Sequence, residues 1–142
     1  DVINSTVTEG YIWIIRNHYN SNHSLADLCL QHGLQRSDNI ILDDGEYDLY
    51  SLLKSVQLHV TAYSSVCYEA ELANINTVII ESSIGLKIYD EEIRKGIFYF
   101  ASNKKDFLSI LYSAPSGVIN SEKYISYNDD FAGTINKLCV GC

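Results

Sequence analysis

The chain has 142 residues, 46% of them hydrophobic, and a formal net charge of −8. This length suits one globular domain with a single core, and the apolar content is too high for a disordered chain. No apolar run reaches the roughly 18 to 20 residues of a membrane helix, and the acidic charge argues against a broad surface for nucleic acid or anionic lipid. We expect a cytoplasmic protein without a transmembrane segment, and the start at Asp1 suggests a fragment of a longer protein.

The first half of the chain alternates short strands with short helices. Residues 11–16 form an aromatic and β-branched run that predicts a buried strand, and Ser24 with Asp27 predicts a capping box that starts a helix ending at Gly33. Residues 39–42 predict a second strand. The turn that follows leads to a helix with Leu49, Leu52 and Leu53 on one face.

The second half continues the alternation. Residues 58–61 and 77–80 predict two more strands, with a helix between them that starts at Ser64 and Ser65 and carries Val66, Ala70 and Ala73 at helical spacing. A loop holding Gly85, a polar helix ended by Gly96, and a fifth strand over 97–100 follow. Asn103 then predicts the cap of a helix with Phe107, Leu108 and Leu111 on its apolar face.

This order of elements predicts an α/β fold: a Rossmann-like three-layer sandwich with a mostly parallel sheet of about five or six strands. We expect residues 1–114 to form the Rossmann-like domain. Residues 115–142 form a C-terminal extension, which starts near Pro115 and has a final helix from Asp129 or Asp130 through Ile135 and Leu138.

The four cysteines do not predict a metal or redox site. Cys29 and Cys67 fall in apolar-periodic segments, where a reduced thiol behaves as a small buried hydrophobe. Cys139 and Cys142 form a CxxC pair without the helix or second cysteine pair of a redox or zinc site. We expect no metal and no cofactor.

The candidate ligand site lies at the carboxyl ends of the predicted strands, where ligands of open parallel sheets bind. The third strand runs directly into Tyr63, Ser64 and Ser65 at a helix start, where amides and hydroxyls suit a phosphate. Glu69 shares a helix face with Ser65, one turn away, and suits a ribose diol. The alternative is that the serines only cap the helix and Glu69 only complements its dipole.

Three other loops add candidates at the same edge. After the first strand, Arg16 suits a phosphate and His18 a phosphate or a base; after the second, Asp44 and Gly45 suit a nucleoside. Lys87 suits a diphosphate or a sugar carboxylate. For each of these residues, an ordinary loop or surface position remains the alternative interpretation.

The motifs IIRNHYN, DNIILDDGEYDLYSLLKS, HVTAYSSVCYEA and TVIIESSIG, taken in order, resemble the C-terminal domain of GT-B glycosyltransferases of bacterial capsule and surface polysaccharides. The resemblance covers roughly residues 11–111. The pairing of His18 with Ser64 and Ser65 is similar to that of sialyltransferases and Kdo transferases, whose donors are CMP-sugars, although Tyr19 stands where those families have proline.

The resemblance implies that Ser64 and Ser65 bind the donor phosphate, Glu69 the ribose, and His18 the phosphate or base. It implies a CMP- or UDP-linked sugar as donor and a glycan acceptor held by a missing N-terminal domain. The chain is long enough for only one of the two GT-B domains, so nucleotide binding without efficient transfer is expected. The resemblance also allows peripheral association of the full-length protein with a membrane.

Two other functions remain open: a nucleotide-sugar 2-epimerase-like domain, and a non-catalytic α/β module that binds protein partners. Three enzyme classes are disfavoured. The chain contains no G-x-G-x-x-G after its first strand, no G-x-x-x-x-G-K-[ST], and no G-x-S-x-G around its serines, which argues against dehydrogenases, P-loop NTPases and hydrolases.

Overall fold

The structure is a computed structural model that describes residues 2–17, 22–80, 83–113 and 123–129, the last of these as a backbone strand. The chain is α/β with parallel strands, as the sequence predicts. The strands are β1 (Tyr11–Asn17), β2 (Ile40–Asp43), β3 (Leu58–Thr61), β4 (Asn76–Ile80), β5 (Tyr99–Ala101) and β6 (Lys123–Asp129). The helices are α1 (Val2–Thr8), α2 (Leu25–Gln31), α3 (Leu49–Ser55), α4 (Val66–Leu72), α5 (Ser83–Ile88), α6 (Asp90–Arg94) and α7 (Lys104–Ser113).

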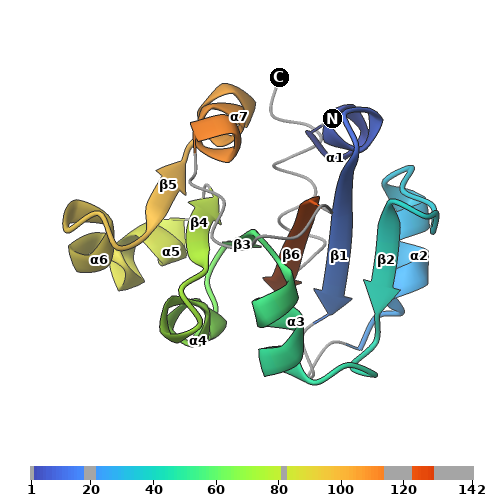
Figure 1. Ribbon diagram of the computed structural model, residues 1–142, viewed down its shortest axis with the longest axis horizontal. Helices are drawn as coiled ribbons and strands as arrows, with labels where there is room; N and C mark the ends of the chain where they lie inside the picture. Colours follow the sequence, from blue (N-terminus) through green and yellow to red (C-terminus); the bar gives the residue numbers. More distant parts are fainter. Residues whose placement is uncertain (1, 18–21, 81–82, 114–122, 130–142) are drawn as a thin grey trace.

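The strands lie in the order β2-β1-β6-β3-β4-β5, from β2 at the right of Figure 1 to β5 at its left. Strands β1 and β2 form one parallel pair, and β3, β4 and β5 form a parallel trio. Strand β6 pairs in parallel with β1 on one side and β3 on the other, and so joins the two groups. The chain runs outward from β1 to β2, and in the opposite direction from β3 through β4 to β5. The strand order therefore changes direction between β1 and β3.

Alternation along the strands buries side chains on both faces. In β1, Trp13 and Ile15 belong to a core cluster with residues of α1, α2 and α7, whereas Ile14 belongs to a second cluster with residues of α3 and α4. In β4, Val78 and Ile80 join the first cluster and Ile79 joins a third, near α6. Such strands, apolar on both faces, are typical of a parallel sheet covered by helices. In Figure 1, α1 and α7 lie at the top and α3 and α4 at the bottom.

Most of the predicted helix ends are confirmed. The Ser24 side chain accepts a hydrogen bond from the Asp27 amide at 3.4 Å, which caps α2. The Asn103 side chain accepts one from the Asp106 amide at 3.0 Å at the start of α7. Gly33 and Gly96 have φ values of +69° and +73°, the left-handed conformation that glycine adopts easily after a helix.

Four details of the prediction were wrong or missing. Helix α1 and strand β6 were not predicted, and β6 lies in the middle of the sheet although its residues belong to the predicted C-terminal extension. Gly85 lies inside α5 rather than in a loop. A glycine is needed at this position because a Cβ would collide with the Ala62 carbonyl oxygen. Strand β5 begins at Tyr99 instead of residue 97, because the amides of Ile97 and Phe98 both donate to the Glu92 carbonyl and complete the end of α6.

Some predictions fall outside the described residues. The Cys139–Cys142 pair and the start of the C-terminal extension at Pro115 lie there, as does a final helix from Asp130. A helix that starts at Asp129 is wrong, because Asp129 is the last residue of β6 and pairs with β1. Among the described residues, no helix is long and apolar enough to cross a membrane.

Candidate functional site

The parallel strands bring the predicted site residues to one edge of the sheet. Arg16 lies near the end of β1 and is in register with Asp43, the last residue of β2. Ser64 and Ser65 follow the end of β3 by three and four residues. Two strand spacings separate β1 from β3, with β6 between them, so about 10 Å lies between the two groups of residues. His18 lies outside the described residues.

Arg16 makes polar contacts within the protein. Its Nη1 atom lies 3.2 Å from Asp43 Oδ2 and donates a hydrogen bond to the Tyr47 carbonyl at 2.9 Å. The Arg16 side chain is 19% exposed and the Asp43 side chain 0% exposed. The positive charge that was predicted to bind a phosphate is thus already paired with a buried carboxylate.

Asp43 also fixes the loop after β2. Its Oδ1 atom accepts hydrogen bonds from the amides of Gly45 at 3.0 Å, Glu46 at 3.0 Å and Tyr47 at 3.4 Å. Gly45 has a φ of +96°, so the loop uses the left-handed conformation at the glycine. The prediction named Asp44 and Gly45 as ligand residues, but it did not include the role of Asp43 in fixing this loop. An aspartate directly before Asp-Gly is the usual signal of a side chain that binds its own turn.

Acidic groups dominate the surroundings of this loop. Asp44 and Glu46 are exposed, and Asp48 caps α3 by accepting a hydrogen bond from the Ser51 amide at 2.9 Å. Hydrogen bonds from Ser51, and to a smaller extent the charge of Arg16, lower the pKa of Asp48. The loop therefore suits hydroxyl or amino groups of a ligand better than a phosphate.

Two hydrogen bonds at Ser64 hold the loop between β3 and α4 in place. The Ser64 hydroxyl accepts a hydrogen bond from the Val66 amide at 3.3 Å, and the Tyr89 hydroxyl donates to the Ser64 carbonyl at 2.8 Å. Burial raises the pKa of the Tyr89 phenol well above its usual value, so Tyr89 stays a neutral donor. Tyr63 is 38% exposed.

Ser65 differs from its neighbour. It occupies the N-cap position of α4 and is exposed, but its side chain makes no capping hydrogen bond. Glu69, one turn along α4, is exposed as well. The alternative that Ser65 serves only as a helix cap therefore loses its main support. The four-residue spacing places Ser65 and Glu69 on neighbouring positions of one helix face.

Lys87 lies on α5, exposed to solvent. The contact between Gly85 and the Ala62 carbonyl holds α5 against the loop that leads to Ser64. Lys87 is two residues after Gly85 on the same helix, so its backbone lies near that loop.

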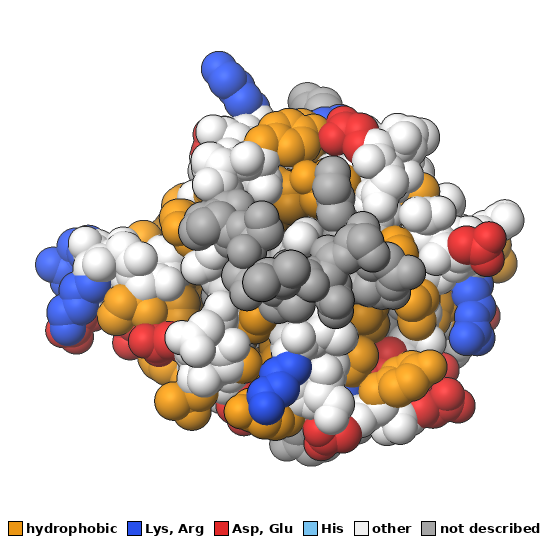
Figure 2. Space-filling model, in the orientation of Figure 1, with side chains coloured by type: hydrophobic (Ala, Val, Ile, Leu, Met, Phe, Trp, Pro, Cys, Tyr) orange, Lys and Arg blue, Asp and Glu red, His pale blue; other side chains and the backbone are white. Residues whose placement is uncertain are grey.

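The remaining polar groups of interest lie in the core. Cys29 and Cys67 are buried free thiols, as predicted, and burial raises the pKa of Cys29 to about 12 and that of Cys67 to about 11. No group of three histidine, cysteine, aspartate or glutamate side chains suited to a metal ion occurs within the described ranges. On the face seen in Figure 2, the basic side chains are scattered among acidic ones.

Comparisons of this chain with protein-family models, curated proteins and solved structures found no match.

Proposed function

We propose that this chain is the nucleotide-sugar-binding half of a GT-B-type glycosyltransferase of polysaccharide or surface-glycan biosynthesis. In this proposal the strands form the Rossmann-like half of a GT-B fold, and the donor is a CMP- or UDP-linked sugar. The chain binds the donor but does not transfer the sugar efficiently without a second domain that holds the glycan acceptor.

The strand order supports a ligand at this edge. Ligands of open α/β sheets bind outside the carboxyl ends of the strands, at the point where the strand order changes direction. In this chain that point lies between β1 and β3; Arg16 lies near the end of β1, and Ser65 follows β3.

The observation that carries the proposal is the pair formed by Ser65 and Glu69. The Ser65 hydroxyl is exposed at the start of α4 without a capping bond, so it is available to donate to a phosphate oxygen. Glu69 presents an exposed carboxylate one turn away, which suits the two hydroxyls of a ribose. Electrostatic help to the leaving phosphate would come from donors at this edge of the sheet.

The other candidate residues take secondary roles. Asp44 and Gly45 would contact the nucleoside, and His18 the phosphate or base. Tyr63 and Lys87 would border the phosphate and the sugar. Because Arg16 is paired with Asp43, its role in the proposal is to hold the loop after β2 and to offer its remaining donors to the ligand.

The experiment is a calorimetric titration of the chain with CMP, UDP and CDP. One nucleotide should bind, and both Ser65→Ala and Glu69→Ala should weaken its binding by roughly fivefold or more, the loss of a hydrogen bond to a charged group. Ser109→Ala on α7 and Glu71→Ala on α4 are matched controls at exposed positions and should leave binding unchanged. Absence of binding to all three nucleotides would contradict the proposal.

One observation favours a second candidate, a non-catalytic α/β module that binds protein partners. The phosphate-binding role predicted for Arg16 competes with its ion pair to Asp43, and the adjoining loop is acidic. A chain that binds no nucleotide but forms a defined oligomer or complex in solution would support this candidate.

A further inference from the structure

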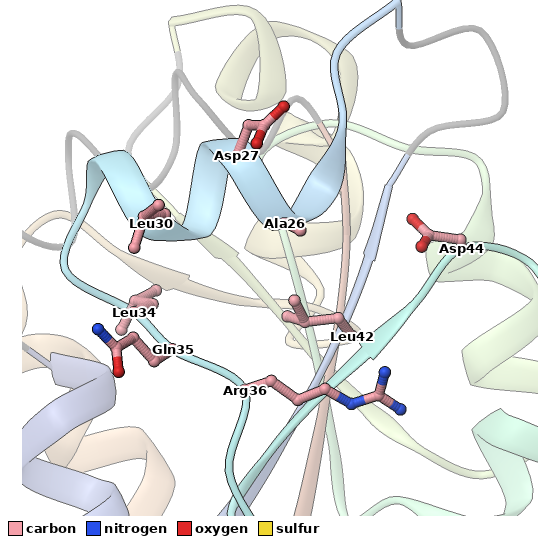
Figure 3. Close-up of a pocket in the computed structure, with 8 residues that line it drawn as sticks. All are labelled: Ala26, Asp27, Leu30, Leu34, Gln35, Arg36, Leu42 and Asp44. Carbon is pink, nitrogen blue, oxygen red and sulfur yellow. The ribbon is translucent and has the colours of Figure 1, made fainter.

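A pocket of about 300 Å³ lies between α2 and β2, as Figure 3 shows. Strand β2 is at the end of the strand order, so the pocket lies at the edge of the sheet and away from the loop that holds Ser65. Three strand spacings, about 14 Å, separate β2 from β3. A volume of this size matches the lower end of small-molecule sites.

The floor of the pocket is aliphatic. Leu34 is buried, Leu42 is half-buried, and Leu30 is 62% exposed on α2. Gly33 turns the chain after α2, and the Leu34 amide donates to the Cys29 carbonyl at 2.8 Å. The backbone therefore holds the floor in place without a ligand, and its surface suits the flat face of a ring.

The rim of the pocket carries three charged side chains, Asp27, Arg36 and Asp44. All three are exposed, and none has an ion pair within the part of the chain that the structure describes. Burial and, secondly, the charge of Asp44 raise the pKa of the Cys29 thiol on α2, which is consistent with an Asp44 carboxylate close to that helix. Asp43 fixes the start of the loop that presents Asp44.

These charges define the chemistry of a suitable ligand. Two carboxylates against one guanidinium disfavour a phosphate at this position. In Figure 3, the guanidinium of Arg36, from the segment before β2, and the carboxylate of Asp44, directly after β2, lie toward the same end of the pocket. A guanidinium donates to ring and carbonyl acceptors, and a carboxylate accepts from a ring amino group; the carboxylate contact is how proteins recognise the amino group of cytosine.

We propose that this pocket binds an uncharged nucleoside whose base carries an amino group beside a ring acceptor, as cytidine does. The base lies on Leu30, Leu34 and Leu42, Arg36 donates to its acceptors, and Asp44 accepts from its amino group. The inference shares Asp44 with the proposed function, in which this residue contacts the nucleoside of the donor, but it does not need Ser65, because a nucleoside has no phosphate.

The test is a titration of the chain with cytidine and with uridine, in which binding is measured by ligand-observed NMR. Uridine has a carbonyl in place of the amino group and should bind at least about fivefold more weakly, the loss of one good base contact. Leu30→Glu places a charge on the floor at an already exposed position and should weaken cytidine binding by about tenfold or more. Arg36→Gln should weaken it by roughly fivefold.

Leu72→Glu is the matched control, since Leu72 is 81% exposed on α4, and it should leave cytidine binding unchanged. Three results would overturn the inference: no cytidine binding at millimolar concentration, equal binding of uridine, or binding that Leu30→Glu and Arg36→Gln leave intact. Ser65→Ala separates the two proposals. If it weakens CMP but not cytidine, both sites stand; if CMP binds and cytidine does not, only the donor site stands.

Discussion

Asp43 and Arg16 form a pair in which one carboxylate oxygen faces the guanidinium at 3.2 Å while the other oxygen accepts three backbone amides. The carboxylate is fully buried, and Arg16 in turn donates to the Tyr47 carbonyl. This pair joins the ends of β1 and β2 to the loop between β2 and α3. The loop that presents Asp44 and Gly45 is therefore fixed before any ligand arrives.

Asp43→Ala should lower the free energy of unfolding by about 3 kcal/mol, because it leaves Arg16 partly buried without its counter-ion and three amides without an acceptor. Asp43→Asn keeps an acceptor for the amides and should cost less. Urea denaturation of both variants measures the difference. Equal losses would mean that the charge pair with Arg16, and not the three amide hydrogen bonds, dominates.

Gly85→Ala should destabilise the chain, although alanine usually favours a helix over glycine by roughly 1 kcal/mol. The added Cβ would collide with the Ala62 carbonyl oxygen and touch an Ile79 methyl group at 3.0 Å. Overpacking of this kind costs about 1 to 3 kcal/mol. Thermal unfolding checks the sign, with Ser83→Ala at an exposed position of the same helix as the control. A stabilised Gly85→Ala variant would contradict the close approach of α5.

The parts of the fold that could be predicted from the sequence are those with strong local signals. The apolar runs of β1, β3 and β4 and the caps Ser24 and Asn103 are patterns of neighbouring residues, and the structure confirms them. Helix α1 gave no such signal. It has seven residues, and it is stabilised by burying Val2, Ile3 and Thr6 in the core, a tertiary contact that the spacing of so few residues does not indicate.

The candidate site likewise contains features that local sequence patterns predict and features that only the fold brings together. The sequence predicted that Ser65 and Glu69 share a helix face, because helical spacing is local, and the structure confirms that both lie at the start of α4, exposed. The partner of Arg16 could not be predicted, because the register between β1 and β2 decides that Asp43 lies beside it. The sequence also contained no pattern for the pocket between α2 and β2, since its lining comes from segments on either side of Gly33 and from Leu42.

Thr6→Val should lower the free energy of unfolding by about 2 kcal/mol, because it leaves the buried indole N–H of Trp13 without a hydrogen-bond acceptor. The Trp13 indole nitrogen donates to the Thr6 hydroxyl at 2.9 Å, and both side chains are fully buried. Trp13 is the chain's single tryptophan, so its fluorescence reports unfolding of the core directly. Thr8→Val, at an exposed position of the same helix, is the matched control. Equal stability of the two variants would contradict the role of this hydrogen bond.

The last prediction concerns His59, which is fully buried on β3. Its Nδ1 atom lies 3.2 Å from the Thr77 hydroxyl, and its Nε2 atom has no partner within the described part of the chain. Burial lowers the pKa of His59 from 6.5 to about 4, so the folded chain keeps the ring neutral. Above pH 6.5 the ring is neutral in both states and has no effect on the pH dependence of stability. Between pH 6.5 and pH 4 the unfolded chain binds a proton that the folded chain does not.

The free energy of unfolding should therefore fall by about 3 kcal/mol over this range through His59 alone, at about 1.4 kcal/mol per pKa unit. His59→Gln cannot gain a proton, so its stability should fall less steeply with acid than that of the unmodified chain. Urea denaturation at several pH values between 7 and 4 measures the stability of the unmodified chain and of His59→Gln. The difference between their stabilities cancels the titration of the carboxylates that both chains contain. His32→Gln removes a histidine that is not fully buried and controls for histidine number. Parallel curves for the unmodified chain and His59→Gln would mean that the imidazole gains access to water in the folded state.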